Sequence, residues 1–444
     1  MNAICRFVLL CALLHVATPL SAQIGLPPLP TQGLPVPPLP TDRVPLPAPL
    51  PNAASGAQQL LSSVRARART LLQRYPDQVE RDPRGAPVVR SVILALSPSD
   101  QALQQALARG FQIQSDETLQ PLGERVVTLL APARLTTRRA LRDLRSADPA
   151  GTYDFDHLFV STQTAVAAAA ANAGDPTGAT ALPELVDIRV GLIDSGVDAG
   201  HPVFASRGPE LSGCDGKPAA SEHGTAVASL FVGRSTEFHG AAPGAHLVAV
   251  DVYCNGAAPG GRVRDIVAAL GTLMAADVRV INMSIVGPDN AVLGAVIRKV
   301  IGQSIVVVAA SGNDGPNAAP LYPAAYPGVV AVTAVDAHEK PLIEASGGEH
   351  VRFAAPGADM LAASLGGQFK AVRGTSYASP LVAGLLARLL AHEDGLAVEQ
   401  VVQHLAASAA DRSKAPRGLR HDYGLVGMDL RTDPNTFAGR VAPQ

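Results

Sequence analysis

Tryptophan is absent from this sequence, aromatic residues make up only 4%, and neither sign of charge is in clear excess. Among 444 residues, 36 Lys and Arg stand against 38 Asp and Glu, so the formal net charge of -2 gives no reason to expect a nucleic-acid partner. No Cys or His cluster has the spacing of metal ligands, and no segment beyond the first residues is long and apolar enough to span a membrane. The length and the 47% hydrophobic content instead indicate a globular chain with one large domain and one smaller domain.

The N-terminal residues have the pattern of a secretory signal peptide. Arg6 supplies the positive charge, the segment from Phe7 to Val16 is a short apolar core, and a Leu-Ser-Ala cleavage site ends at Ala22. We therefore expect residues 1–22 to be a signal peptide and the mature protein to be secreted, periplasmic or at the cell surface. An uncleaved membrane anchor is the alternative.

The four cysteines fall into two pairs. Cys5 and Cys11 lie within the predicted signal peptide, which leaves Cys214 and Cys254 as an even pair in an exported protein. We expect Cys214 and Cys254 to form a disulfide. Two free buried thiols, or half of a metal site, are the alternatives.

The first half of the chain divides into a spacer, a small domain and a linker. Residues 23–57 are rich in proline, which neither a helix nor an interior strand accommodates, so we expect an extended spacer. In the domain expected over residues 58–160, a helix is predicted over residues 58–81. The candidates after it alternate as β-α-β-β-α-β, over residues 88–96, 99–109, 111–115, 124–130, 136–145 and 154–160. That order predicts a small ferredoxin-like α+β domain, and residues 161–184, rich in Ala, Thr and Gly, are expected to be a flexible linker.

From residue 185 the pattern changes to strands that alternate with helices. Continuous apolar runs such as Ile-Val-Val-Val at residues 305–308 suit strands buried on both faces of a sheet. The strand candidates are residues 187–193, 246–253, 278–283, 304–310 and 329–335, with shorter ones near Val351 and Phe369. The helix candidates are residues 225–232, 263–276, 291–301 and 398–407, with one more that begins near Ser376. This alternation predicts a parallel α/β domain over residues 185–435, followed by a tail of residues 436–444.

One segment near the end of this domain concentrates the chemical signals: Arg-Gly-Thr-Ser-Tyr-Ala-Ser-Pro-Leu-Val-Ala-Gly at residues 373–384. Its hydroxyl side chains lie where an apolar helix begins, and Pro380 fits the first turn of that helix. Ser376 would therefore have its oxygen beside free backbone N–H groups and the positive end of the helix dipole, where developing negative charge is stabilised. A serine that merely caps the helix is the alternative for such a segment taken alone.

Three upstream residues complete a pattern with Ser376. Asp194 ends Val-Gly-Leu-Ile-Asp, His223 stands in His-Gly-Thr-Ala-Val-Ala, and Asn313 stands in Ser-Gly-Asn-Asp-Gly. Taken singly, an Asp or Asn that follows a strand is more often a turn residue. Four such segments in the order Asp, His, Asn, Ser are a much stronger signal than any one of them.

Together these segments resemble the motifs of the subtilisin-like serine proteases. The segment around Ser376 matches the family's Gly-Thr-Ser-Met-Ala-Ser-Pro-His-Val-Ala-Gly except at Tyr377 and Leu381. The resemblance implies a parallel-sheet α/β subtilisin-like catalytic domain in which Ser376 attacks a carbonyl carbon and His223 transfers the proton. Asp194 would orient and stabilise the imidazole. The side-chain amide of Asn313 would contribute to the oxyanion hole, and no cofactor is implied for the chemistry.

The resemblance extends to the substrate cleft and to calcium. Two segments are expected to line the primary pocket: Ser284, Ile285, Val286 and Gly287, and Ala310, Ser311 and Gly312. Val286 stands where the family has glycine, which leaves the shape of the pocket open. Residues 422–426, Asp-Tyr-Gly-Leu-Val, resemble the family's closing motif. Residues 234–240 are short with Glu237 as their only carboxylate, so we expect the family's usual calcium loop to be absent, while weaker structural calcium sites stay open.

For the small N-terminal domain the resemblance is one of layout. Propeptides of this family often have the ferredoxin-like architecture and act as folding chaperone and inhibitor. We therefore expect a secreted endopeptidase that cuts polypeptides, is inhibited by its own N-terminal segment and cleaves itself between residues 161 and 185. The alternatives are an accessory domain with another task, a catalytically inactive binding module, and a different hydrolase such as an esterase. The absence of Gly-x-Ser-x-Gly around Ser376 counts against the esterase.

Overall fold

The computed structural model describes residues 64–161, 185, 188–236, 238–254, 260–392, 395–410 and 424–435. Several predicted segments lie outside these residues: the signal peptide, the proline-rich spacer, residues 162–184 of the linker, the tail, Glu237 and the Asp-Tyr pair at 422–423. Among the described residues, no helix is long and apolar enough to cross a membrane.

The first part of the described chain is a small antiparallel sheet with two helices, as its β-α-β-β-α-β pattern predicts. The elements are β2 (Pro87–Leu96), α3 (Asp100–Ala108), β3 (Gln112–Leu119), β4 (Glu124–Leu130), α4 (Thr137–Ala147) and β5 (Thr152–Ser161). The strand order is β5-β2-β4-β3, so each pair of strands joined by a helix is separated by a third strand. This is the ferredoxin-like arrangement that the element order predicts.

The helix predicted over residues 58–81 is wrong from residue 75 onward. α2 (Val64–Arg74) ends before a proline, and β1 (Val79–Arg81) pairs antiparallel with β2 instead of continuing the helix. Pro76 explains the break, because a proline disfavours helical backbone in the residue before it and supplies no N–H itself. The side chain of Val79 is buried in this strand, which the predicted helix did not indicate.

The larger part is organised around a seven-stranded sheet with the order β14-β13-β12-β10-β6-β8-β7. Its strands are β6 (Arg189–Asp194), β7 (Glu210–Gly213), β8 (His246–Asp251), β10 (Val280–Met283), β12 (Val306–Ala310), β13 (Val330–Val335) and β14 (Val351–Pro356). Every neighbouring pair is parallel, which confirms the predicted parallel α/β class. The carboxyl ends of these strands meet at one edge, where the loops of an open α/β sheet gather functional residues.

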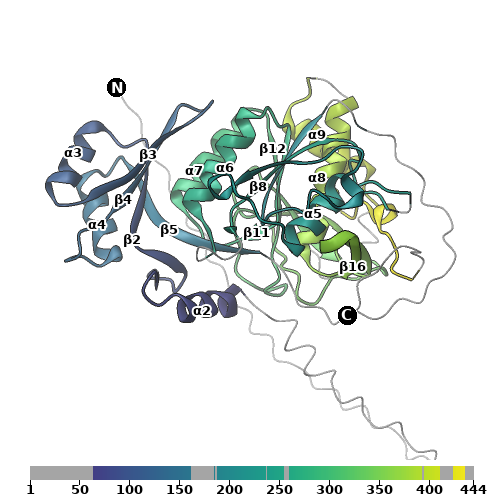
Figure 1. The fold of residues 1–444 in the computed structure, drawn as a ribbon, viewed down its shortest axis with the longest axis horizontal. Coiled ribbons are helices and arrows are strands. Elements are labelled where there is room, and N and C mark those ends of the chain that lie inside the picture. Colours follow the sequence, from purple (N-terminus) through teal and green to yellow (C-terminus); the bar gives the residue numbers. More distant parts are fainter. Residues whose placement is uncertain are drawn as a thin grey trace, which may run out of the picture. The chain divides into compact units, whose positions relative to one another are not determined.

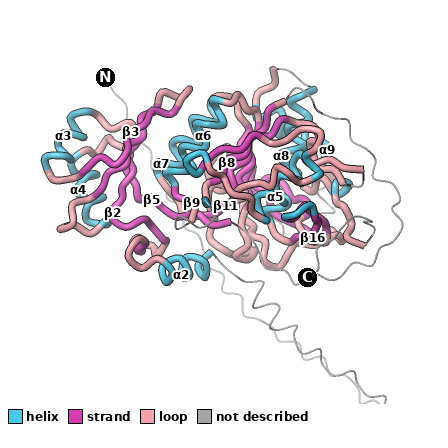
Figure 2. The backbone as a smooth tube through the Cα atoms, in the orientation of Figure 1, coloured by secondary structure: helices cyan, strands magenta, loops and turns pink. Residues whose placement is uncertain are grey.

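Helices cover both faces of this sheet, as Figure 1 and Figure 2 show. α5 (Glu222–Val232), α8 (Thr375–His392) and α9 (Val398–Ser408) share a core with Val306 and Val308. α6 (Val263–Ala275) and α7 (Ala291–Gly302) share another core with Val307. Because successive side chains of a strand point to opposite faces, β12 contributes to both cores and has to be apolar throughout.

Five short strands escape prediction: β1, β7, β9 (Gly261–Arg262), β11 (Ile285–Val286) and β15 (Met360–Ser364). β15 forms an antiparallel pair with β16 (Gln368–Val372), the strand expected near Phe369. Most of them lie outside the longer apolar runs that revealed strands as short as β10 and β12, so no hydrophobic period marks them in the sequence.

The end of β5 joins the two parts of the chain. From Leu158 to Ser161 it pairs antiparallel with both β9 and β11. Phe159 is fully buried there, and a Cβ placed on Gly287, next to β11, would lie 2.6 Å from its ring. Glycine at this position therefore lets the phenylalanine ring rest against the backbone.

The predicted disulfide between Cys214 and Cys254 is confirmed. It links η2 (Cys214–Gly216) to the segment that follows β8, with 5.3 Å between the two Cα atoms.

Replacing both cysteines by serine should lower the free energy of unfolding by about 4 kcal/mol, because the bond closes a loop of 40 residues in the unfolded chain. Urea unfolding of the oxidised protein and of the Cys214→Ser/Cys254→Ser variant measures the difference. Both samples carry Ser376→Ala, so that the self-cleavage expected from the sequence does not interfere with the measurement. An unchanged urea midpoint would contradict the prediction.

Candidate active site

Asp194 and His223 are hydrogen-bonded to each other at the carboxyl edge of the sheet. Asp194 ends β6 and is fully buried, and His223 lies in the first turn of α5 with 2% of its surface exposed. The Nδ1 atom of His223 lies 2.7 Å from the Oδ1 atom of Asp194, which also accepts the backbone N–H and the hydroxyl of Ser195. A carboxylate only accepts hydrogen bonds, so Nδ1 carries the proton and Nε2 is the basic nitrogen.

Ser376 lies in the first turn of α8 and is fully buried. Its Oγ atom and the Nε2 atom of His223 have no hydrogen-bond partner in the part of the chain that the structure describes. The ring of Tyr377 lies against the ring of His223, with 5.5 Å between the centroids, so the first turns of α5 and α8 are neighbours. The structure thus brings the predicted Ser and His together with one polar atom of each left unpaired.

The side chain of Asn313 is hydrogen-bonded to Thr375, the residue that precedes Ser376. Asn313 follows β12 with 5% of its surface exposed, and its Oδ1 atom accepts the backbone N–H of Thr375 at 3.1 Å and the hydroxyl at 3.0 Å. The hydroxyl oxygen of Thr375 in turn accepts the backbone N–H of Gly312 at 3.2 Å. Because the amide oxygen faces Thr375, the amide NH₂ group faces away from it. Sequence reasoning assigned Thr375 no such role.

The first predicted wall of the pocket begins beside the end of β10. The hydroxyl of Ser284 donates to the backbone oxygen of Ser376 at 2.9 Å and lies 2.9 Å from the hydroxyl of Ser379, so this side chain supports the start of α8. Ile285 and Val286 form β11. Both are fully buried in the contact with β5.

The second predicted wall follows β12, which is the neighbour of β10 in the sheet. Ala310 ends that strand, and the Ser311 hydroxyl donates to the backbone oxygen of Ser346 at 2.8 Å. Gly312 has a φ of 104°, which a residue with a side chain would adopt only with strain. The structure therefore places both predicted walls at the edge that carries Asp194 and Asn313.

Two groups with shifted pKa values, Tyr253 and Arg67, lie beside these residues. Burial raises the pKa of Tyr253 well above its usual value, and the nearby Asp194 raises it further. Burial lowers the pKa of the Arg67 guanidinium, an effect that Tyr253, Asp314 and Tyr377 oppose. Asp314 and Tyr377 directly follow the predicted oxyanion and nucleophilic residues, so Arg67 of α2 lies close to the site. Sequence reasoning assigned no role to α2.

Two carboxylates of β5 contact the N-termini of two helices of the larger part. The Oδ2 atom of Asp154 accepts the backbone N–H of Ala291 in α7 at 2.7 Å. The Oδ1 atom of Asp156 accepts the backbone N–H of Arg264 in α6 at 3.1 Å. Each carboxylate thereby supplies an acceptor for an N–H group that has no partner within its own helix. The sequence could have indicated this pair of carboxylates, since residues 154 and 156 lie on one face of a predicted strand.

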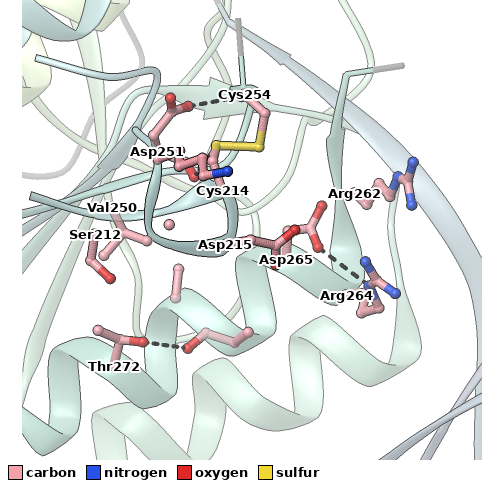
Figure 3. Close-up of a pocket in the computed structure, with 14 residues that line it drawn as sticks. Ser212, Cys214, Asp215, Val250, Asp251, Cys254, Arg262, Arg264, Asp265 and Thr272 are labelled. Carbon is pink, nitrogen blue, oxygen red and sulfur yellow. Dashed lines mark hydrogen bonds and ion pairs between the residues drawn. A yellow bond between two sulfur atoms is a disulfide. The ribbon is translucent and has the colours of Figure 1, made fainter. Parts of the chain in front are cut away.

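A separate pocket of about 530 Å³ lies beside the disulfide, between η2, the end of β8 and α6 (Figure 3). Its lining includes none of the four predicted catalytic residues, and the ion pair between Arg264 and Asp265 forms part of its wall. Its charged groups are of both signs, which points to no ligand of one charge. Within the described ranges, no three His, Cys, Asp or Glu side chains are grouped to hold a metal ion.

Comparison with known proteins identifies relatives over the larger part of the chain. A sequence model of the Subtilase family matches residues 186–426, slightly more than half of the chain. Subtilisin from Bacillus pumilus is 33% identical over 230 residues, which are 50% of this chain and 84% of that protein. Subtilisin amylosacchariticus from Bacillus subtilis subsp. amylosacchariticus is 30% identical over 230 residues, but these span only 60% of its length.

A solved structure has the same fold. Fervidolysin from Fervidobacterium pennivorans, described as a keratinolytic enzyme related to subtilisin, matches with a TM-score of 0.63. The match covers 77% of this chain and 61% of that chain at 19% sequence identity. At this identity the likeness bears on the fold, and it agrees with the α/β class that the sequence predicts.

Replacing Asp156 by Asn should raise the free energy of unfolding at pH 7.5 and leave it unchanged near pH 4. Desolvation raises the pKa of Asp156 from 3.8 to about 6 in the native state, so the native state binds a proton that the unfolded chain releases between these values. Above pH 6 the ionised carboxylate therefore destabilises the native state, by about 3 kcal/mol at most, and this cost disappears as the pH falls through 6 toward 4. Asn stays neutral and still accepts the Arg264 N–H.

Urea unfolding at pH 4 and pH 7.5 in a Ser376→Ala background tests this. The groups that act on Asp156 besides burial are Asp265, Arg262 and Arg264. The exposed Asp429 provides a control, since Asp429→Asn should change the free energy of unfolding at neither pH. The prediction is refuted if the advantage of the Asp156→Asn variant over its parent is no greater at pH 7.5 than at pH 4.

Proposed function

Because this chain belongs to the subtilase family, we propose that it is a secreted serine endopeptidase with a triad of Asp194, His223 and Ser376. One observation carries the proposal: the 2.7 Å hydrogen bond between Asp194 and Nδ1 of His223 leaves Nε2 unpaired, on the helix end next to the one that carries the unpaired Ser376 hydroxyl. A helix cap or a core histidine would account for either residue alone. Neither accounts for two buried, unpaired polar atoms on adjacent helix ends.

In the proposed reaction, His223 removes the proton of the Ser376 hydroxyl as its oxygen attacks the carbonyl carbon of the substrate. The proton moves from Oγ to Nε2, and the imidazolium then gives it to the leaving amine. Asp194 holds the tautomer with the proton on Nδ1 and stabilises the positive charge. Water then attacks the acyl-enzyme, and His223 acts first as base and then as acid a second time. No cofactor is proposed, because side chains move each proton and hold each charge.

The oxyanion would be held by the NH₂ group of Asn313 and the backbone N–H of Ser376. The bonds from Thr375 to the Oδ1 atom of Asn313 support this, because they fix the amide in one orientation before any substrate binds. Preorganised donors cost no rearrangement when charge develops on the carbonyl oxygen. In subtilisin the loss of such an Asn lowers kcat by about 10²- to 10³-fold.

Polypeptide substrates would bind by adding a strand between β9 and β11. β5 supports this proposal, because it pairs with both short strands through backbone atoms, as an extended peptide would. Backbone pairing places few demands on sequence, and specificity then depends on the pockets that receive alternate side chains. The proposed pocket walls are Ser284–Gly287 and Ala310–Gly312.

The N-terminal domain would act as an intramolecular inhibitor, because its last strand occupies the edge that a substrate strand needs. Asp154 and Asp156 contribute contacts outside that edge, and Arg67 lies close to the site. The expected signal peptide and the disulfide both favour export to an oxidising compartment.

Ser376→Ala should abolish hydrolysis of a peptide substrate while the protein stays folded. In subtilisin the loss of the nucleophile lowers kcat by about 10⁶-fold. Turnover of a peptide and of an ester, together with labelling by a fluorophosphonate, measures the activity, and circular dichroism checks the fold. Activity of the variant within tenfold of the unmodified protein would refute the assignment of Ser376. Turnover of the ester alone would favour an esterase.

The chain should also cut itself between Ser161 and Leu185. β5 ends at Ser161 beside β11, so the last described residue before residues 162–184 lies next to the proposed catalytic residues. The unmodified chain and the Ser376→Ala variant are expressed side by side in a protease-deficient host, and the N-termini of the products are sequenced. We expect a shortened product only from the unmodified chain, with the N-terminal piece still bound. Identical products from both would show that self-cleavage does not occur.

A further inference from the structure

Glu344 is a buried carboxylate that the proposed mechanism does not use. It lies in the segment between β13 and β14, and its side chain is 0% exposed. The Nε and Nη2 atoms of Arg373 donate to its two oxygens at 2.7 and 3.0 Å. Such a fork of two parallel hydrogen bonds is stronger and more directional than a single contact. Arg373 stands only three residues before Ser376.

The same segment also holds the loop of Asn313. The backbone oxygen of Glu344 accepts the N–H of Gly315 at 2.8 Å, and the backbone N–H of Ser346 donates to the backbone oxygen of Gly312 at 2.8 Å. The hydroxyl of Ser346 accepts the N–H of Asp314 at 3.3 Å. Residues 344–346 therefore bind the Asn313 loop on both sides of the asparagine.

The two proposed oxyanion donors come from the loop after β12 and from the first turn of α8, and residues 344–346 contact both that loop and the segment that leads into α8. One donor is the side chain of Asn313 and the other is the backbone N–H of Ser376. Between Arg373 and Ser376 lies Gly374, whose φ of 134° is a conformation that few other residues adopt. Gly374 has no side chain to hold this segment, and its N–H donates to the backbone oxygen of Gly357 at 2.8 Å. The fork on Arg373 adds a side-chain anchor immediately before it, which limits where the N–H of Ser376 can point.

We propose that Glu344 is a positioning residue, which holds Arg373 and thereby fixes the Ser376 N–H relative to the amide of Asn313. The inference rests on the proposed peptidase function. It predicts that loss of the fork leaves substrate binding almost intact and weakens the hydrogen bonds that form only in the transition state. A small misplacement of a catalytic group costs up to about 10²-fold in rate, so we expect kcat to fall by about ten- to a hundredfold.

The test uses four variants of the processed protein. Glu344→Gln removes the charge at constant shape, Arg373→Lys keeps the charge but cannot form the fork, and Arg373→Ala removes both. Glu210→Gln is the matched control, because Glu210 pairs with Arg189 at the opposite end of the strand that carries Asp194. kcat is expressed per site titrated with a fluorophosphonate, and KM, the melting temperature and the Kd of a peptide boronic acid are measured for each.

We expect kcat to fall least in Arg373→Lys, further in Glu344→Gln and most in Arg373→Ala. KM should stay within about twofold, and the boronic acid should bind more weakly in parallel with the loss of kcat. The lysine variant should retain part of the activity because its ammonium group still neutralises Glu344. Arg373 has 22% of its side chain exposed, so its variants supply the test if Glu344→Gln does not fold.

A purely structural role would lower the melting temperature without changing kcat per titrated site, and this result would overturn the inference. So would a kcat of Glu344→Gln and Arg373→Lys equal to that of Glu210→Gln. If the unmodified protein neither hydrolyses peptides nor reacts with the fluorophosphonate, the proposed function is wrong and the inference falls with it. If it does both and the variants match it, only the positioning role is wrong.

Discussion

The parallel sheet brings segments that are far apart in the sequence to one edge, and the whole proposed site depends on this constraint. Asp194, Met283 and Ala310 are the last residues of three neighbouring strands, so hydrogen bonds between strands fix their positions. Strands lie about 4.8 Å apart, and residues far apart in the sequence thereby become neighbours. α8 brings its first turn to the same edge, where the Ser284 hydroxyl holds the backbone of Ser376.

Contact between the two parts of the chain combines a shared apolar core with backbone pairing. Leu94, Leu96, Leu119 and Val126 of the small sheet pack in one core with α6 and α7. β5 offers N–H and C=O groups to β9 and β11, and its two carboxylates accept N–H groups at the starts of α6 and α7. Phe159 adds a buried side chain, and its fit depends on the absence of a side chain at position 287. Backbone pairing of this kind places few demands on sequence, so the side chains of the shared core and the two carboxylates make the contact specific to this strand.

The sequence predicted the parallel class, the β-α-β-β-α-β order and the disulfide because each has a local signal. Continuous apolar runs mark strands buried on both faces, and four short motifs mark Asp194, His223, Asn313 and Ser376. It did not reveal that Thr375 orients Asn313, because that contact depends on where β12 and α8 lie in space. The boundary of α2 was missed because the Arg- and Leu-rich pattern continues up to Pro76, and only tertiary pairing made residues 79–81 a strand.

Tyr377 is a departure from the family motif that changes how the residue next to Ser376 responds to oxidants. It packs on the ring of His223 at the position where the related motif has methionine. A methionine thioether is oxidised to the sulfoxide, a polar group that disturbs whatever packs against it, whereas a phenol does not undergo this reaction. Hydrogen peroxide therefore cannot convert the residue next to Ser376 to a sulfoxide, and oxidation of sulfur in this chain has to occur at other residues.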